Sequence, residues 1–183
     1  DNLFLWDGNG GNILYSSADG GYSWTSVGNY TVNGQLYFFN DALFFARGGD
    51  VLISSDEGAT QDTATTGFQA ASVTGVFPGG NDIWASVNAN ISWPGFQKSV
   101  HKRDAGTGQW LHTPFEQIAA TDDGHLFALS NDTLMRSDDG GANWYVLPPP
   151  FFWGGTYYSF MDLSAAGNIV YLTRANIYVY SKD

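Results

Sequence analysis

The chain has 183 residues, and its 7 basic and 18 acidic residues give a formal net charge of −11. This balance argues against nucleic acid or an anionic membrane as a partner, because both require clustered Lys and Arg. Cysteine is absent, which excludes disulfides, thiol catalysis and zinc–thiolate sites. Aromatic residues reach 16% and no stretch shows apolar residues at helical spacing, so we expect an all-β fold with almost no helix.

Strand-like runs rich in β-branched and aromatic residues recur in pairs along the chain. The first runs of these pairs lie at 3–6, 42–45, 82–85, 126–129 and 169–172. The second runs that we identify lie at 12–16, 50–54, 132–136 and 176–180. Each of these second runs leads into a short turn motif, so the repeating unit is strand, turn, strand, motif, strand.

The motif places an Asp two residues after a Ser, a Gly two residues further on, and then a Trp. Copies over 17–24 and 137–144 are strong, the copy over 54–61 has Gln61 in place of Trp, the copy over 102–110 lacks the Ser and has one extra residue, and the last is cut off at 181–183. The motif residues are Ser17, Asp19, Gly21, Trp24, Ser54, Asp56, Gly58, Asp104, Gly106, Trp110, Ser137, Asp139, Gly141 and Trp144. We expect the Asp to accept backbone N–H bonds, the Gly to take a positive φ, and the Trp to cover the turn.

The units end near Asp19, Asp56, Asp104, Asp139 and Asp183, at intervals close to the roughly 40 residues of a four-stranded propeller blade. The motif resembles the Asp-box (BNR) repeat, S-x-D-x-G-x-x-W, of sialidase-like and sortilin-like β-propellers. The resemblance implies one β-propeller domain over 1–183, with each box at the turn between the third and fourth strands of a blade. It also implies structural roles for the boxes, away from the ligand-binding face. Calcium binding is the weaker alternative, because each box offers one or two carboxylates and calcium takes about six to eight oxygens.

The family's strand phase implies that the chain opens in strand two of its first blade and stops after strand three of its fifth. About two strands would then be missing from five complete four-stranded blades. Three readings stay open: a segment of a longer propeller, which we favour, an edge completed by a neighbouring chain, or a terminal unit that departs from the pattern.

A sialidase-like enzyme is the alternative function, and it would need three arginines that converge on a substrate carboxylate. Arg47 and Arg174 occupy equivalent repeat positions, whereas Arg103 and Arg136 approach the boxes, so a triad is not expected. A glycosidase of the ordinary kind needs two carboxyls that face each other. The candidates outside the box aspartates are Glu57, Glu116, Asp122, Asp123 and Asp162. Because loop and turn aspartates are commonly solvated or capping, we expect no catalytic residues.

His101, His112 and His125 lie on successive strand-like segments of one region. Nothing in their spacing indicates that they converge, so we expect structural or exposed histidines, no metal site and no cofactor.

Three sequons, at Asn29, Asn90 and Asn131, favour a glycosylated, secreted protein. An acidic composition, few lysines and a first residue other than Met point the same way. No apolar segment approaches the roughly 20 residues that span a bilayer, so membrane insertion is not expected. We therefore expect an extracellular location.

Two long departures from the minimal repeat, at 88–97 and 148–158, carry clustered aromatics. The candidate binding residues are Trp93, Phe96, Phe151, Phe152, Trp153, Tyr157 and Tyr158. Their aromatic faces suit stacking on sugars or anchoring a protein interface, and packing in the core is the alternative. We expect a non-catalytic interaction or structural module with a protein or glycan partner, which includes assembly of copies through the incomplete terminal blades.

Overall fold

The computed structural model describes residues 2–7, 12–30, 36–68, 72–91, 95–131, 133–148, 162–174 and 177–182. Of the side chains at 89–91, 95–97, 174 and 177–182 nothing is described. The described residues form strands and turns without a helix, as the sequence predicts for an all-β protein. Among them, no helix has the length and apolar character needed to cross a membrane.

The strands form five antiparallel sheets, each built from strands that follow one another in the chain. The first sheet contains β1 (Leu3–Asp7), β2 (Ile13–Ser17) and β3 (Thr25–Asn29). The second contains β4 (Leu36–Phe39), β5 (Ala42–Arg47), β6 (Asp50–Ser54) and β7 (Asp62–Thr63). The third contains β8 (Ser72–Gly79), β9 (Asp82–Ile91), β10 (Gly95–Arg103) and β11 (Trp110–His112). The fourth contains β12 (Gln117–Ala120), β13 (Leu126–Ser130), β14 (Thr133–Ser137) and β15 (Tyr145–Val146), and the fifth contains β16 (Asp162–Ala166), β17 (Ile169–Arg174) and β18 (Ile177–Lys182).

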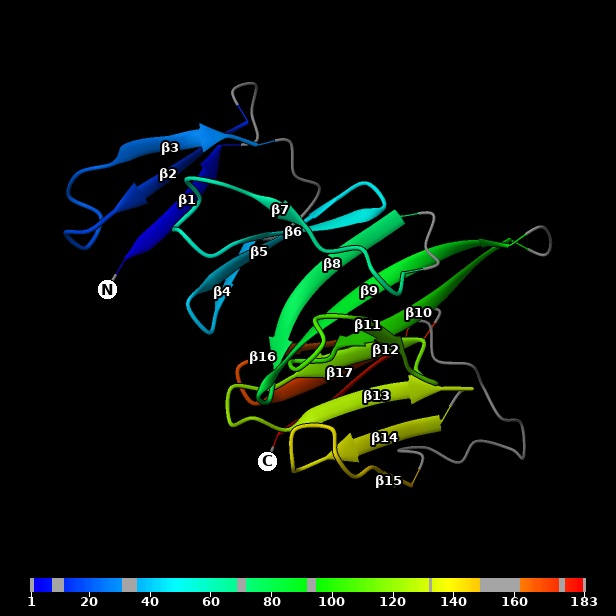
Figure 1. The fold of residues 1–183 in the computed structure, drawn as a ribbon. Helices are drawn as coiled ribbons and strands as arrows, with labels where there is room; N and C mark the ends of the chain where they lie inside the picture. The colour runs from blue at the N-terminus through cyan, green and yellow to red at the C-terminus, as the bar shows by residue number, and fades with distance from the viewer. Residues whose placement is uncertain are drawn as a thin grey trace.

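The strand phase agrees with the one inferred from the boxes. In each four-stranded sheet, the box lies in the turn between the third and fourth strands. The box of the first sheet joins β2 to β3, so β1–β3 correspond to strands two to four of a complete sheet. The described strands of the last sheet, β16–β18, lead up to the truncated box and correspond to strands one to three. In Figure 1 the sheets follow one another in chain order from the upper left to the lower right, with β16 and β17 behind the fourth sheet.

Apolar side chains fill the space between each sheet and the next. Four clusters of buried residues correspond to the four junctions between consecutive sheets. The junction of the first and second sheets, for example, contains Leu14 from one side and Leu43, Phe45 and Leu52 from the other. This arrangement explains why strand residues of both parities are apolar, because inner sheets are covered on both faces.

An aromatic residue occupies the same place on the second strand of every sheet. The strand pairing puts these residues in register, and they are Phe4, Phe44, Trp84, Phe127 and Tyr171. We call this set the aromatic row. Its inner members face the following sheet and are nearly inaccessible, with exposed fractions of 4% for Phe44, 1% for Trp84 and 8% for Phe127. The row is therefore the repeated hydrophobic anchor between sheets.

Candidate functional site

The box of the first sheet is held by side chains that bond to their own turn. The Ser17 hydroxyl donates to Asp19 Oδ1 at 2.8 Å and accepts from the Gly21 N–H at 2.8 Å. The Asp19 carboxylate also accepts from the backbone N–H and the hydroxyl of Ser23, at 2.9 and 2.6 Å. Trp24 Nε1 donates to the Gly21 carbonyl at 3.0 Å and so closes the turn. Both oxygens of the carboxylate are therefore occupied within the turn.

The boxes of the second and fourth sheets repeat this geometry. In the fourth, Asp139 accepts from the Ser137 hydroxyl at 2.8 Å and from the Asn143 N–H and side-chain amide at 2.8 and 2.7 Å. In the second, Asp56 accepts from the Ser54 hydroxyl at 2.8 Å, and Thr60 supplies the other two donors. The place of the missing Trp is taken by Gln61, for which no equivalent contact is described.

Hydrogen bonds to the charged form hold the pKa of each box carboxyl down. The pKa of Asp56 falls to about 2, chiefly through the Thr60 hydroxyl, and that of Asp139 falls to about 2, chiefly through the Asn143 N–H. The pKa of Asp19 is lowered further, mainly by the Ser23 hydroxyl. Groups of this kind stay ionised and do not donate protons near neutral pH, so the boxes are not suited to acid catalysis.

The third box departs from the pattern. Asp104 accepts from the N–H and the hydroxyl of Thr107, at 2.7 and 2.8 Å, so its turn is one residue tighter. Trp110 does not close this turn as Trp24 closes its own. It lies in the core between the second and third sheets with 2% of its surface exposed, stacks on Phe68 with ring centroids 4.8 Å apart, and donates to the Ala64 carbonyl at 2.8 Å. Its structural role is therefore packing between sheets.

The boxes define one end of the sheets, which we call the box end. Contacts between sheets keep these ends together: Asn2 Nδ2 donates to Glu57 Oε1 at 2.6 Å, and the Asp122 N–H donates to the Gly167 carbonyl at 3.0 Å. Because the strands are antiparallel, turns between second and third strands, and connections between sheets, lie at the opposite end.

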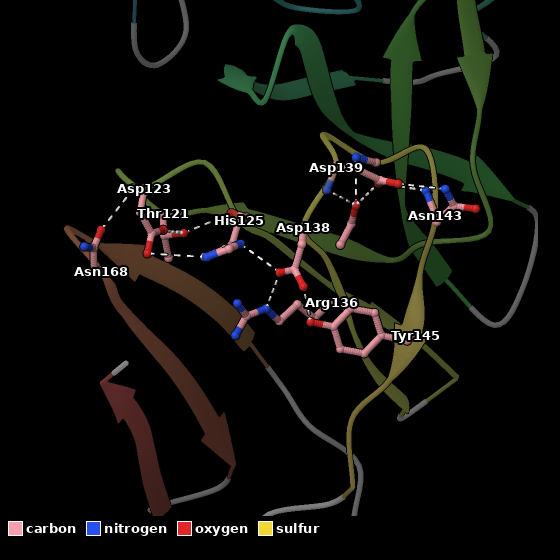
Figure 2. A network of polar contacts seen from close by, with 11 residues as sticks. Thr121, Asp123, His125, Arg136, Asp138, Asp139, Asn143, Tyr145 and Asn168 are labelled. Atoms are coloured by element: carbon pink, nitrogen blue, oxygen red, sulfur yellow. Dashed lines mark hydrogen bonds and ion pairs between the residues drawn. The ribbon is translucent and has the colours of Figure 1, made fainter.

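A polar network joins the fourth and fifth sheets at the box end (Figure 2). His125 lies between two aspartates, with Nδ1 2.8 Å from Asp138 Oδ1 and Nε2 3.6 Å from Asp123 Oδ2. Arg136 Nε donates to Asp138 Oδ1 and the Tyr145 hydroxyl donates to Asp138 Oδ2, both at 2.6 Å.

The network extends through Asp123 to the fifth sheet. Asp123 accepts from the Thr121 hydroxyl at 2.5 Å, and its N–H donates to Asn168 Oδ1 at 3.1 Å. These contacts lower the pKa of Asp123, mainly through Thr121, and that of Asp138, mainly through Tyr145. The hydrogen bond to Asp138 raises the pKa of Tyr145. The two carboxyls therefore stay ionised and the phenol stays protonated near neutral pH, and the bond from the Asp123 N–H to Asn168 makes the network a contact between the fourth and fifth sheets. Asp123, His125 and Arg136 stand out in the sequence, but their convergence does not, because it depends on two separate turns of the chain.

The three histidines do not meet at one point. His101 and His112 are directly opposite on β10 and β11, with ring centroids 5.2 Å apart, whereas His125 belongs to the network above. Among the described residues, no group of three or more His, Cys, Asp or Glu is arranged to hold a metal ion.

The remaining catalytic candidates are dispersed. Glu57 bonds to Asn2 at the box end, while Glu116 Oε1 accepts from the Asn131 N–H at 3.3 Å at the opposite end. Asp162 begins β16 at the opposite end, far along the strand from the Asp122–Asp123 turn. The arginines also divide between the ends, with Arg103 and Arg136 near the boxes and Arg47 and Arg174 at the far ends of β5 and β17.

Of the aromatic candidates, Phe96 lies in β10, with only its backbone described, and the rest lie outside the described residues: Trp93, Phe151, Phe152, Trp153, Tyr157 and Tyr158. The described residues that flank them show at which end of the sheets these segments begin and end. Ile91 and Gly95 end the long β9–β10 hairpin, and Val146 and Asp162 bound the connection between the fourth and fifth sheets. Both places are at the end opposite the boxes, and Figure 1 shows the β9–β10 hairpin projecting there beyond the other strands.

The sequon asparagines lie toward the same end. Asn29 ends β3, Asn90 is near the end of β9, and Asn131 is in the β13–β14 turn. Asn29 and Asn131 are exposed, and the side chain of Asn90 is not described.

No family model and no curated protein matches the sequence. Solved structures do match: YCF48 from Cyanidioschyzon merolae, with a TM-score of 0.53 and 14% identity over 87% of this chain, and YCF48 bound to D1 peptide, with 0.51 and 21% over 93%. An ancestral GH74 enzyme gives 0.49 and 17% over 93%. The chain spans 57%, 58% and 27% of these chains, respectively. Identities this low carry the fold alone. Together with the sheet order, the likeness to the YCF48 structures defines this chain as a β-propeller.

Proposed function

We propose that the chain is a non-catalytic β-propeller module that binds a partner at the end of its sheets opposite the boxes. One observation carries the proposal: the described residues that flank both aromatic-bearing departures, 91 and 95 on one side and 146 and 162 on the other, lie at this end. Binding residues concentrate on loops that a rigid scaffold positions, and the box end is already committed to turn hydrogen bonds.

The chemistry of the described carboxyls favours binding over hydrolysis. Acid catalysis near neutral pH needs a carboxyl whose pKa is raised. Every described carboxyl with a resolved shift has a lowered pKa, namely Asp19, Asp56, Asp104, Asp123, Asp138 and Asp139. The two glutamates bond to separate partners at opposite ends of the sheets.

A protein ligand is the first to test, because a propeller of similar fold has been solved with a peptide bound. A glycan ligand is the second, since Trp and Tyr faces also stack on sugars. We further propose that the protein is extracellular and carries glycans on Asn29, Asn90 or Asn131. Such glycans would restrict which part of this end a protein partner reaches.

The test is ligand capture followed by substitution at each end. Partners cross-linked to the chain from its natural source, and ligands found on a glycan array, are measured against Trp93→Ala and Trp153→Ala. Tyr22→Ser, in the first box turn and 94% exposed, is the matched control at the other end. We expect the aromatic variants to lose binding and the control to keep it. The reverse result would refute the proposed face, and turnover of glycosides by the purified chain would refute a non-catalytic role.

A further inference from the structure

Two histidines face each other across neighbouring strands of the third sheet. The register of β10 and β11 places His101 directly opposite His112. At the adjoining position of the same ladder, the Thr113 N–H donates to the Val100 carbonyl at 3.0 Å. Hydrogen-bonded and non-hydrogen-bonded pairs alternate along an antiparallel ladder, and side chains lie closer together in the non-hydrogen-bonded pairs. The two histidines therefore occupy a pair of the closer kind.

The separation of the two rings is suited to a shared ion. Their centroids are 5.2 Å apart and their planes make an angle of 86°. Two imidazoles that bind one tetrahedral Zn²⁺ through nitrogen, with N–Zn distances of about 2.0–2.1 Å, place their centroids about 5 Å apart. The spacing of the strands thus already matches the one that a shared ion requires.

His101 is buried at this pair and has a polar atom without a partner. Its exposed fraction is 4%, and in the described part of the chain no hydrogen-bond partner reaches its buried Nδ1. A buried polar atom costs free energy unless a protein group, a water or an ion satisfies it. The equivalent places of the second and fourth sheets hold the apolar residues Leu52 and Met135, so packing between sheets does not by itself explain a histidine here.

The environment keeps the imidazole of His101 in the form that binds metal. Burial, and secondly the nearby charge of His112, lower the pKa of His101 from 6.5 to about 4. A histidine must be neutral to bind a metal ion. His101 is neutral at pH 7, so no proton has to leave it when an ion binds.

The pair has an apolar side and a solvent side. Phe68 meets the His101 ring edge-on, with centroids 5.2 Å apart, and stacks on Trp110 at 4.8 Å. His112, by contrast, is exposed. An ion that enters beside His112 therefore finds a preformed, partly buried nitrogen ligand behind it.

We propose that His101 and His112 together bind one divalent transition-metal ion of the Zn²⁺ type, and that water completes its coordination shell. Among the described residues, no third His, Cys, Asp or Glu joins them in a metal-binding group, so the site binds more weakly than a structural zinc site with four protein ligands. The ion links the outer strand β11 to β10. Because the pair lies at the box end of β10, away from the proposed partner-binding end, the two proposals fail separately.

Zinc binding is measured by isothermal titration calorimetry at pH 7 on the untagged 183-residue chain after treatment with a chelator. We expect one Zn²⁺ to bind per chain. His112→Gln replaces an exposed ligand, so the fold should survive. Its Kd should rise at least about tenfold, because the loss of a group that merely orients a ligand already costs about 10–100-fold.

Two further variants locate the site. His101→Leu inserts the apolar residue that the second sheet has at this place, and it should lose zinc binding to the same degree. His125→Gln is the matched control, because it removes the third histidine and keeps the pair, and it should bind Zn²⁺ like the wild type. Circular dichroism checks that each variant is folded.

NMR of the imidazole nitrogens tests whether both rings hold the same ion. The signals of His101 and His112 should shift together as Zn²⁺ is added, while those of His125 stay in place. Zn²⁺ should also raise the Tm of the wild type and not that of His112→Gln, since an ion that binds only the folded state stabilises it. A wild type without saturable zinc binding, an unchanged Kd in either pair variant, loss of binding in His125→Gln, or shifts confined to one ring of the pair would each overturn the shared site.

Discussion

His101 is a buried titratable group at an apolar position of the repeat. It lies on β10 between the second and third sheets, at the place that Leu52 and Met135 hold on the third strands of their own sheets. Its exposed fraction is 4%, and its ring meets Phe68 edge-on, with centroids 5.2 Å apart. In the described part of the chain, Nδ1 is buried and has no hydrogen-bond partner.

This environment makes stability depend on pH. Burial, and secondly the nearby charge of His112, lower the pKa of His101 from 6.5 to about 4. The unfolded chain therefore binds a proton at higher pH than the folded chain does. The contribution to the free energy of unfolding is fully present above pH 6.5, is lost progressively as the pH falls from 6.5 to 4, and is gone below about pH 4. At about 1.4 kcal/mol for each pKa unit, the loss is about 3 kcal/mol, or roughly 6–12 °C in Tm for a chain of this length.

The box carboxyls respond in a separate window. Their pKa values, about 2 for Asp56 and Asp139, lie below the ordinary 3.8, so their contribution is present above pH 3.8 and falls only below it. The interval between pH 6.5 and 4.5 therefore isolates His101 from the boxes.

The assay is urea unfolding followed by circular dichroism at pH 7.5, 6.5, 5.5 and 4.5, on the wild type and on His101→Leu. We expect the wild type to lose stability below pH 6.5 and the variant to stay nearly constant to pH 4.5. His112→Gln is the control, and it should keep most of the slope because burial, the larger cause, remains. If His101→Leu loses as much stability as the wild type over this interval, the reasoning is wrong.

Three further substitutions test the repeat. Glu57 has a φ of 58° where the two strong boxes place Gly20 and Gly140, so Glu57→Gly should raise stability by about 0.5 kcal/mol, measured as Tm; a decrease would contradict this. Trp84→Ala should cost about 3–5 kcal/mol in denaturant unfolding, because the side chain is 1% exposed at a junction, and a loss below about 1 kcal/mol would argue against the row as an anchor. Asp139→Asn should lower Tm at pH 7, because the donors of the turn bind the ionised carboxylate. It should also reduce the stability that is lost between pH 4 and 2. The same loss of stability in the variant and the wild type over this interval would contradict the role of the Asp139 carboxylate.

The fold was accessible from the sequence because the box is a local structure. Ser17, Asp19 and Gly21 bond to one another within one turn. Their spacing is therefore set by local hydrogen bonds and does not depend on the packing of the sheets. That spacing set the strand phase, and the phase agrees with the three strands described in the first sheet and in the last. Trp110 differs from the expectation that the box Trp covers its turn. After the tighter third turn, it lies in the core between the second and third sheets.

The aromatic row was visible in the sequence only in part. Phe44, Phe127 and Tyr171 each precede a box aspartate by the same interval, but Phe4 and Trp84 do not, because the hairpins that follow them are longer. Alignment on the boxes therefore hides the row, and the strand register reveals it. The polar network was hidden for a similar reason, since its parts come from turns of two different sheets.

The two ends of the sheets are held by different means, and this difference bears on where function resides. At the box end, the described box carboxylates accept hydrogen bonds from donors of their own turns, and Asp122, Asp123 and Glu57 add bonds from sheet to sheet. A side chain placed here must preserve that geometry, so little freedom is left for a ligand. At the opposite end, the sheets are also bonded to one another, for example by the Leu163 N–H that donates to Gln117 Oε1 at 2.7 Å, and the β9–β10 hairpin extends beyond its neighbours. The hairpin and the connections at this end are not tied to the box geometry, which supports the proposal that a partner binds there.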